Sequence, residues 1–566
     1  MNIKTLVSVN VLAAVLVGCG GGDIELNPSN TVIDSNNTTN NTTNNNDNTG
    51  GGSGDENPCA TYEQNGQTRQ GNFADGNCTY GASFVSDTNP LTVDLNIPAL
   101  DGGLHIFENS LWVGEDVDAS QAANGTSIPQ EGDGPSLSIE AGAQIAFSSS
   151  NDYVRIARGS SIIAEGTADA PIVFSAVQDL RDNAADESDR GLWGGVQING
   201  NGITNKCTDE QREATANNVH NCHITAEGRP ATYGGNNNGE SSGILRYVVI
   251  KHAGFEVVDG SELNGLTLNA VGSGTEIEYV QTYTTQDDGF EMFGGAVDLK
   301  NVVAVNVGDD SIDFSEGWVG NIQYALVTHT SGANRCIEAD NTGGGRADDL
   351  EPFTKGRISN MTCITSNVGE NEGENPSSKG SSEGVLYREG AHFEMYNSIV
   401  TSNASGMASN ECFELDDSEG PQTIFAATGG WSVAKSNVIA CTEATKAGVD
   451  PANGDFDINA WLTSGENTNN VIIDENVTGG LPAVVIEGLD SNPRAYITAA
   501  SMTDGNGGAI NVDVYDVTML ENTFEAGAAP AVGSAGTSNF FDAVDFIGAV
   551  SADNDWVAGW TVGLDN

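Results

Sequence analysis

Short runs of alternating apolar and polar residues fill the chain from about residue 58 onward, and each run is bounded by Gly, Asn, Asp or Ser. Stretches such as SLSIEAGAQIAFSS and YVRIARGSSIIAEG have the period of two that half-buried β-strands show. The small-residue clusters between them predict turns. Helical periodicity of comparable strength is missing, apart from short segments near either end that suit a capping helix. The pattern therefore predicts an all-β protein.

Several of these runs repeat along the chain. TEIEYVQTYTT, VDLKNVVAVNV and GNIQYALVTHT place Ile277, Leu299 and Ile322 at equivalent positions, 22 and 23 residues apart. A period of this size with small-residue corners indicates a β-solenoid, in which each coil has about three short strands and stacks on the next at about 4.8 Å. Gly-rich and acidic insertions, such as NTGGGRADDLEPFTKG, predict inserted loops in the later coils.

The repeat also suggests where the parts of the chain begin and end. We expect an N-terminal β segment or cap over 58–133, the coils over 134–450, and a C-terminal β segment and cap over 451–566. The tail DNDWVAGWTVGL would close the last coil, because an uncovered last coil exposes its core and an unpaired edge.

The first residues indicate export and anchoring. Residues 1–18 have the charged start and short apolar stretch of a signal peptide. LVGC at residues 16–19 resembles the bacterial lipobox, which implies cleavage before Cys19 and lipidation of its thiol. Gly20 stands where an aspartate would retain the protein in the inner membrane, so we expect an outer-membrane lipoprotein, on the periplasmic face or the cell surface. The Asn/Thr/Gly-rich stretch 19–57 predicts a disordered tether.

Eight cysteines follow Cys19, an even number in an exported chain, so we expect disulfides. A zinc site is not expected, because there is no C-x-x-C pair or close Cys/His cluster. Sequence alone leaves the connectivity open, and sequence neighbours suggest Cys59–Cys78, Cys207–Cys222, Cys336–Cys363 and Cys412–Cys441.

The chain has 79 acidic and 21 basic residues, for a net charge of −58. This balance excludes nucleic acid as a partner, because phosphate binding needs clustered Lys and Arg. It fits a soluble surface in a medium rich in divalent ions. No cofactor is required, and Ca²⁺ is the ion that such a surface favours.

Paired aspartates occur in TQDDGFEMF and in VGDDSIDF, and Asp288 and Asp310 are 22 residues apart. Because this interval is one coil, we expect them to stack on one outer face, with Asp287 and Asp309 beside them. Glu291 and Asp313 should form a second stacked pair. Stacked like charges repel, so a cation, a shared proton or solvent must offset them.

Two interpretations of the aspartate motifs need no catalysis. Asp-Asp-Gly and Gly-Asp-Asp are ordinary turn sequences, and turn residues recur once per coil in a solenoid. A Ca²⁺ site at Asp287, Asp288, Asp309 and Asp310 is the alternative, because calcium takes oxygen ligands only.

The chain resembles a broad group of exported bacterial proteins with a right-handed parallel β-helix of the pectin-lyase-like type. IEAGAQIAFSSSNDYVRIARG, RGLWGGVQINGNG, GILRYVVIKHAG, DDGFEMFGG and DDSIDFSEGW carry the resemblance over 134–335, as do the last thirty residues. Because most of these proteins have no assigned activity, the resemblance implies fold and location more than function.

A narrower resemblance links the aspartates to polygalacturonases. QDDG at 286–289 is similar to their Asn-Thr-Asp-Gly motif, and GDD at 308–310 matches their Gly-Asp-Asp. The resemblance implies that Asp309 is the general acid or its partner, and that Asp288 and Asp310 activate water for an inverting hydrolysis. The resemblance implies His329 and Arg335 as the remaining catalytic candidates. The sequence departs from the family there, because His329 lacks flanking glycines and Arg335 comes earlier than the substrate-binding arginine of the family.

Two aromatic residues are candidates for a ligand platform. Trp193 lies among glycines in RGLWGGVQING, and Tyr233 lies in the long loop 206–240. Both could stack on a sugar, but a tryptophan at a solenoid corner more often packs into the core, which is the interpretation we favour for Trp193.

Taken together, these features favour a non-catalytic binding or adhesion lipoprotein that recognises glycans or an envelope partner and is joined to the membrane by its lipid. One alternative is a polysaccharide-active enzyme that uses Asp288, Asp309 and Asp310. The other is a structural spacer.

Overall fold

The computed structural model divides the chain into two units, Met1–Glu56 and Asn57–Asn566. The predicted signal peptide, Cys19 and most of the tether lie outside the described residues, so they stay predictions. The described residues are 57–564 apart from 216–217, 229–230, 259–260, 330–332, 344–345, 367–381, 403–410, 418–421, 442, 448, 451–453, 475–483, 487–501, 505–506 and 521–539.

Within these residues the chain forms a parallel β-helix, because successive strands join parallel neighbours in two large sheets. Strand-to-strand crossovers of this kind are right-handed, so the predicted right-handed β-helix is confirmed. The ten-stranded sheet consists of β7 (Leu111–Val113), β10 (Val154–Ile156), β13 (Val196–Asn199), β19 (Leu266–Asn269), β21 (Phe290–Phe293), β23 (Ile312–Ser315), β25 (Arg335–Ala339), β27 (Glu383–Tyr387), β30 (Glu411–Leu415) and β33 (Glu443–Ala447).

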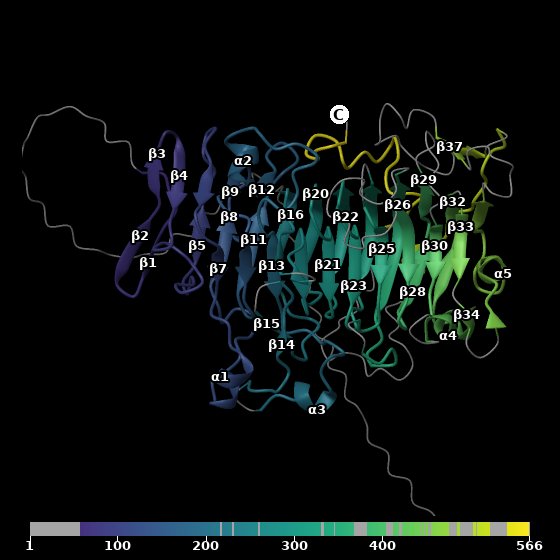
Figure 1. The fold of residues 1–566 in the computed structure, drawn as a ribbon, viewed down its shortest axis with the longest axis horizontal. Helices are drawn as coiled ribbons and strands as arrows, with labels where there is room; N and C mark the ends of the chain where they lie inside the picture. The colour runs from purple at the N-terminus through teal and green to yellow at the C-terminus, as the bar shows by residue number, and fades with distance from the viewer. Residues whose placement is uncertain are drawn as a thin grey trace, which may run out of the picture. The chain divides into compact units, whose positions relative to one another are not determined.

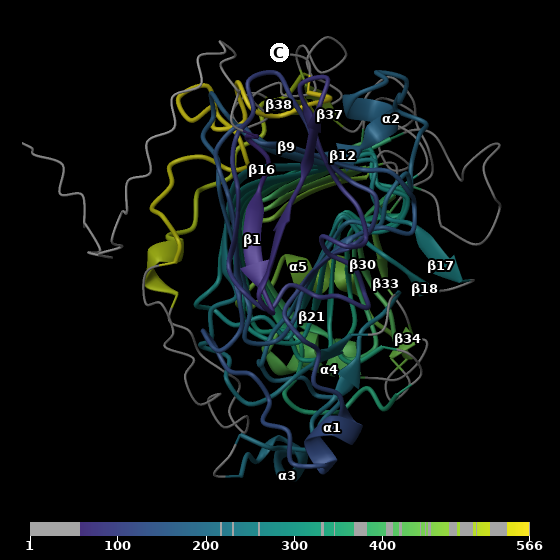
Figure 2. The same cartoon turned by 90° about the vertical axis from the view of Figure 1, so that its left-hand side faces the viewer.

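The second sheet has eighteen strands and runs along the coils beside the first (Figure 1). Figure 2 looks along the coils, so strands of successive coils lie one behind another. The strands are β3 (Asn72–Ala74), β4 (Asn77–Tyr80), β5 (Leu95–Ile97), β6 (His105–Phe107), β8 (Ser136–Ile139), β9 (Gln144–Phe147), β11 (Ser161–Glu165), β12 (Ile172–Ala176), β16 (Gly243–Lys251), β20 (Glu276–Tyr283), β22 (Asp298–Val305), β24 (Asn321–Thr328), β26 (Lys355–Thr365), β28 (His392–Tyr396), β29 (Ile399–Ser402), β31 (Val433–Lys435), β32 (Val438–Cys441) and β36 (Val471–Asp474).

Small hairpins and short helices occupy the ends and the inserted loops. None of the described helices is both long and apolar enough to cross a membrane. The hairpins are β1 (Thr61–Gln64) with β2 (Gln67–Gln70), β14 (Ile224–Thr225) with β15 (Thr232–Tyr233), β17 (Glu256–Val258) with β18 (Ser261–Glu262), β34 (Val449–Asp450) with β35 (Gly454–Asp455), and β37 (Val484–Ile486) with β38 (Met502–Asp504). The helices are α1 (Ala119–Ala123), α2 (Val177–Leu180), α3 (Asp209–Arg212), α4 (Gln422–Gly429), α5 (Ile458–Leu462) and the 3₁₀ turn η2 (Val517–Met519).

The sequence repeat gives the correct strand register. Ile277 pairs with Leu299, and Leu299 pairs with Ile322, as the spacing of the three runs predicted. All three side chains are buried and belong to one continuous interior cluster. Coiling begins before residue 134, because β5, β6 and β7 already belong to the two sheets.

Each long strand of the eighteen-stranded sheet bends at one residue with positive φ. The bends lie at Tyr247 (48°), Tyr279 (55°), Asn301 (56°), Tyr324 (61°) and Asn360 (57°). Asparagine tolerates this left-handed conformation, whereas a bulky side chain is strained there. The bends turn the chain around the corner of each coil and divide each long strand into two halves.

The predicted C-terminal cap is wrong for the described end of the chain. Residues 540–564 do not close the last coil but lie against the side of earlier coils, where Trp560 packs on Tyr247 and Tyr279. The helix α5 covers the coil that ends with β33, and its Ile458 and Leu462 enter the interior core (Figure 1). This helix lies within the predicted C-terminal segment 451–566, but outside the tail DNDWVAGWTVGL to which the cap was assigned.

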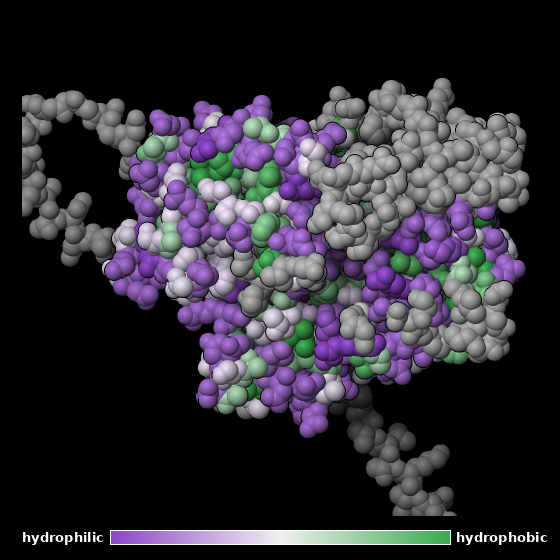
Figure 3. All heavy atoms as spheres, in the orientation of Figure 1, coloured by the Kyte–Doolittle hydropathy of each residue, from purple (hydrophilic) through white to green (hydrophobic). Residues whose placement is uncertain are grey.

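Most of the face seen in Figure 3 is hydrophilic where the residues are described. Apolar residues are scattered over it singly or in small groups, which is normal for a soluble protein. The large negative charge of the chain is consistent with such a surface.

All four suggested disulfides are present: Cys59–Cys78, Cys207–Cys222, Cys336–Cys363 and Cys412–Cys441. Cys336 lies on β25 and Cys363 on β26, and both are fully buried. This bond therefore ties the two large sheets together inside the solenoid and closes a sequence separation of 27 residues.

Replacing both Cys336 and Cys363 with alanine should lower the free energy of unfolding by about 3 kcal/mol, because the cross-link no longer restricts the unfolded chain. Urea unfolding followed by circular dichroism measures the change. An unchanged unfolding midpoint would show that packing of the two sheets alone holds these coils together.

Candidate functional site

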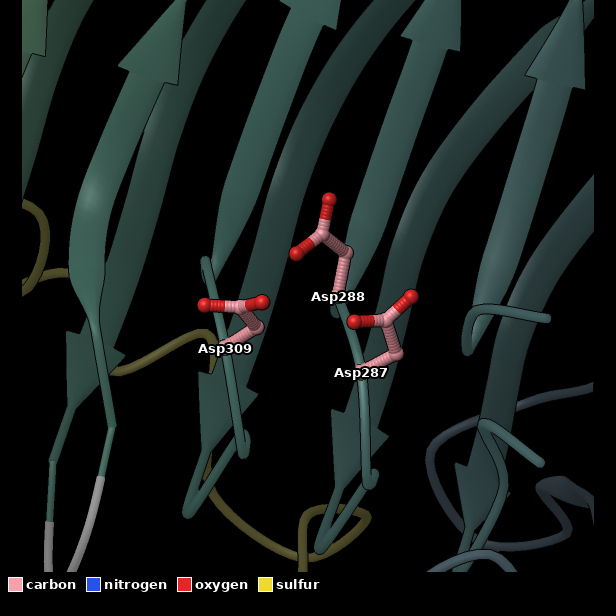
Figure 4. A group of neighbouring side chains, drawn as sticks. All are labelled: Asp287, Asp288 and Asp309. Carbon is pink, nitrogen blue, oxygen red and sulfur yellow. The ribbon is translucent and has the colours of Figure 1, made fainter. Parts of the chain in front are cut away.

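Two consecutive turns carry the paired aspartates. Asp287 and Asp288 precede β21, and Asp309 and Asp310 precede β23 one coil further on. The parallel register of β21 and β23 places Asp288 level with Asp310. Figure 4 shows Asp287, Asp288 and Asp309 close together on the two neighbouring coils.

Close stacking of these turns explains their glycines. A Cβ atom at Gly308 would lie 2.2 Å from the carbonyl oxygen of Gln286, and one at Gly289 would lie 2.6 Å from that of Ser311. A side chain at either position would push the coils apart. Turn geometry thus accounts for the glycines, while the aspartates need a separate explanation.

The carboxylates of the turns bond from coil to coil. The backbone N–H of Asp310 donates to Asp288 Oδ1 at 2.9 Å, and that of Arg335 donates to Asp310 Oδ1 at 2.6 Å. One coil earlier, Asn264 fills the same place, and its Oδ1 accepts from the N–H of Asp288 at 3.2 Å. The predicted stacking is confirmed, and each stacked side chain caps the backbone of the next coil.

The stacked aspartates have little contact with solvent, because Asp288 and Asp310 are only 6% and 4% exposed. Part of the inserted loop 206–240 packs against the outer side of the ten-stranded sheet, where Gln197 Nε2 donates to the carbonyl oxygen of Glu227 at 3.3 Å. The Glu227 carboxylate is close enough to raise the pKa of Glu291. The carboxylates of Asp288, Asp310 and Glu291 are therefore largely shielded from solvent.

A second column of acids runs parallel to the first. The register aligns Glu291 on β21 with Asp313 on β23, and Asp313 with Glu338 on β25. All three point outward, since their strand neighbours belong to the interior core. The predicted Glu291–Asp313 pair is confirmed and extends by one coil. Asn264 also donates to Glu291, so the two columns are joined by a hydrogen bond.

Burial raises the pKa of these carboxyl groups, and each neighbouring carboxylate raises it further. The pKa values of Asp288, Glu291, Asp310 and Asp313 all lie well above their ordinary range. Burial also raises the pKa of Glu338 to about 7, although Arg388 opposes the rise. When no cation is bound, burial and mutual repulsion therefore favour the protonated form of these acids.

Basic side chains balance only the C-terminal part of the columns. Arg335 contacts Glu383 at 2.5 Å and Glu414 at 2.9 Å. Arg388 contacts Glu338 at 2.5 Å, and Lys446 contacts Glu414 at 2.9 Å. Among the described ion pairs, none joins a basic side chain to Asp288, Glu291 or Asp310.

The unbalanced part has the geometry of a cation site. One oxygen from each of Asp287, Asp288 and Asp309 lies within 4.8 Å of the others, and the same holds for Asp288 with Glu291 and Asp313. Two ligands that each bind Ca²⁺ at about 2.3–2.6 Å are at most about 5 Å apart. The oxygen-only donor set also suits a hard cation. The predicted fourth ligand, Asp310, groups instead with Asp313 and Glu338.

His329 does not belong to the carboxylate columns, which corrects its assignment as a catalytic residue. It is 3% exposed, and its ring nitrogens contact Ser382 Oγ at 2.8 Å and Ser311 Oγ at 3.1 Å. Burial lowers its pKa to about 3. Because the ring is enclosed and both of its nitrogens contact serine hydroxyls, it is not placed to exchange a proton with a bound substrate. Arg335, in contrast, does lie beside Asp310.

Neither predicted aromatic platform is available to a ligand. Trp193 is fully buried, and its ring stacks on Phe147 at 4.7 Å. Tyr233 is 2% exposed and donates its hydroxyl to Glu316 at 2.7 Å. The ligand-platform assignment is therefore wrong for both residues, and the packing preferred for Trp193 is confirmed.

Sequence reasoning missed the C-terminal continuation of the acid column. Glu338 and Glu414 occupy the outward position on β25 and β30 that Glu291 has on β21. The signal was present, since GFEMF, SIDFS, CIEAD and CFELD share an acid between apolar residues. The inserted loops separate the later runs by more than 22 residues, which hid the equivalence.

Comparison with known proteins supports the fold. A family model described as "Pectate-lyase like beta helix domain" matches residues 124–425, more than half of the chain. No curated protein and no solved structure matched in the corresponding searches. The matched range contains both aspartate turns and the acid column. Because the match covers more than half of the chain, the chain belongs to the family of the pectate-lyase-like beta helix domain.

Proposed function

We propose that this protein is an outer-membrane lipoprotein that binds glycans without cleaving them, through Ca²⁺ held by its two acid columns. The observation that carries the proposal is a pair of carboxylate groups that share Asp288, namely Asp287, Asp288 and Asp309, and Asp288, Glu291 and Asp313. Within each group the oxygens lie within coordination distance of one another, and Asp287, Asp309 and Asp313 are partly exposed. A cation bound there offsets their repulsion and offers open coordination positions to sugar hydroxyl or carboxylate oxygens.

Two features favour binding over hydrolysis. An inverting glycosidase keeps its carboxyl groups about 6.5–9.5 Å apart to admit a water molecule, whereas oxygens of Asp288 and Asp309 lie within 4.8 Å. Arg335, the basic residue nearest to Asp310 in the columns, is engaged by Glu383 and Glu414. A cation can instead bridge the acid columns to an acidic or a neutral glycan.

The envelope location rests on the sequence of residues 1–57. The signal peptide, the lipobox at Cys19 and the Asn/Thr-rich tether support a lipid-anchored protein whose folded part stands away from the membrane. An adhesive surface that is held on a tether can reach polysaccharide or another envelope protein.

A combined binding and turnover assay tests the proposal. Residues 57–566, a compact unit of their own, are incubated with immobilised neutral and acidic polysaccharides, with Ca²⁺ or with a chelator. We expect retention only with Ca²⁺ and no new reducing ends. Asp287→Asn with Asp309→Asn should abolish retention, because the cation loses two charged ligands.

Glu240→Gln is the matched control. Glu240 is also a buried carboxyl group with a pKa raised to about 7, but it lies outside the columns and accepts from Gly272 and Ser242. This variant should bind as the unmodified protein does. New reducing ends that disappear in Asp309→Asn and Asp310→Asn would make the protein a hydrolase. The absence of both retention and new reducing ends would favour a structural spacer.

A further inference from the structure

The C-terminal residues 540–564, called the strap below, lie along the outer side of the eighteen-stranded sheet (Figures 1 and 2, yellow). Their apolar side chains form a cluster with outward-facing residues of the coils, among them Val249, Val303 and Leu326, which join Trp556 and Trp560. An outward-facing strand position in contact with water would normally be polar. These apolar positions are therefore suited to being covered by another segment of polypeptide.

Side-chain amides of the coils bind the backbone of the strap. Gln281 Nε2 donates to the carbonyl oxygen of Val562 at 2.7 Å, and its Oε1 accepts from the N–H of the same residue at 2.8 Å. Gln323 makes the same pair of bonds to Asp542, at 3.2 and 2.8 Å. Each glutamine thus bonds both the N–H and the carbonyl oxygen of one strap residue, as a residue of a neighbouring strand would.

The amide contacts continue in later coils. Asn360 Nδ2 donates to the carbonyl oxygens of Phe546 and Gly548 at 3.1 and 3.2 Å. The N–H of Gly548 donates to the carbonyl oxygen of Asn397 at 2.8 Å. Such bonds recognise a peptide backbone and not the side chains attached to it, as in β-strand addition.

The coils do not need the strap to complete their interior. None of the described strap residues belongs to a strand of either large sheet. The interior core contains buried residues only up to Leu462, with Ile472 packed against it, and the strap residues belong to separate clusters on the outside. The strap therefore adds a layer to a core that is already closed.

The strap also accepts the hydrogen bonds of both its indole N–H groups within itself. Trp556 Nε1 donates to the carbonyl oxygen of Ala549, and Trp560 Nε1 donates to that of Trp556, both at 2.8 Å. The indole rings are left to pack on the bends of the coils, where Trp560 meets Tyr247 at 5.7 Å between ring centroids. Docking therefore needs no new partner for either indole N–H.

We propose that this side of the coils is a docking site for an extended peptide and that the strap is its ligand, held as a separable segment. The chemistry selects a chain with two tryptophans four residues apart, bound through its backbone by amide side chains of several coils and by Lys300, whose Nζ donates to the carbonyl oxygen of Phe540 at 3.1 Å. This site is independent of calcium and of the acid columns, which lie on the other sheet. A peptide of residues 540–566 should therefore bind in trans once the strap is detached.

The full chain is cut at a specific protease site introduced between residues 521 and 539. We expect the strap to stay associated with the coils during size-exclusion chromatography. An excess of dye-labelled peptide 540–566 should then replace it, and fluorescence anisotropy gives the dissociation constant. Unfolding of the coils upon cutting, or failure to take up the peptide at high micromolar concentration, overturns the proposal.

Amide variants test the backbone recognition. Gln281→Leu combined with Gln323→Leu removes four hydrogen bonds to the strap backbone and should weaken peptide binding about tenfold or more. Gln144→Leu, on the exposed side of β9, is the matched control and should leave binding unchanged. Equal affinity in the double variant and the control would show that the two glutamines contribute nothing to binding and would overturn their proposed role in backbone recognition.

Discussion

With Ca²⁺ chelated, the free energy of unfolding should fall as the pH rises from about 5 to about 8. Burial raises the pKa of Asp288, Glu291, Asp310 and Asp313 well above the ordinary range, and that of Glu338 to about 7. At a pH well below 3.8, the ordinary pKa of aspartate, these groups are protonated in both states. As the pH rises further, the unfolded chain releases these protons before the folded protein does. The free energy of unfolding therefore falls until the pH exceeds the folded-state pKa values.

The expected size of this loss is several kcal/mol. For Glu338 alone, the difference between 4.5 and about 7 corresponds to about 3 kcal/mol. Added Ca²⁺ should reverse the trend, because it binds only the ionised, folded columns. At a concentration of about 1,000 times its Kd it would contribute about 4 kcal/mol. Thermal unfolding at several pH values, with and without Ca²⁺, measures both effects.

Asparagine variants separate the charge from the shape of the columns. Asn264 already occupies the position equivalent to Asp288 and accepts the same backbone hydrogen bond. Asp288→Asn with Asp310→Asn should therefore fold, should be more stable than the unmodified chain at pH 8 in chelator, and should lose most of the gain from Ca²⁺. If Ca²⁺ stabilised the double variant as much as the unmodified chain, the ion would bind elsewhere, and the proposed binding site would lose its basis.

The coil repeat was predictable because it is a local property of the sequence. Ile277, Leu299 and Ile322 are equivalent in spacing, in residue type and in register. Stacking of Asp288 on Asp310 followed from the same interval. The four disulfides also followed from sequence order, because each joins cysteines that are neighbours along the chain.

The burial of the site was not predictable, because it depends on contacts between distant segments. Glu227, in an inserted loop, lies near Glu291, and no periodicity links the two. The strap reaches from residue 562 back to Gln281, so its aromatic residues appeared to be a terminal cap. His329 likewise follows a strand at the expected place for a catalytic residue, but the fold encloses it between two serines.

Trp193→Ala should lower the free energy of unfolding by about 3–5 kcal/mol, which is typical of a large aromatic residue removed from a packed core. Its ring lies nearly parallel to that of Phe147, at 3°, and its Nε1 donates to the carbonyl oxygen of Lys251 at 2.7 Å. Alanine leaves a cavity and an unsatisfied carbonyl oxygen. Urea unfolding followed by tryptophan fluorescence and circular dichroism measures the loss.

Trp431→Ala is the matched control, because Trp431 is 49% exposed. Its removal should change the free energy of unfolding by less than about 0.5 kcal/mol. The pair also tests the ligand-platform hypothesis directly, since a platform residue contributes to affinity and a core residue to stability. If Trp193→Ala kept its stability and lost glycan retention, the ring would have to be accessible in solution, and the enclosed packing of β13 against β10 would be wrong.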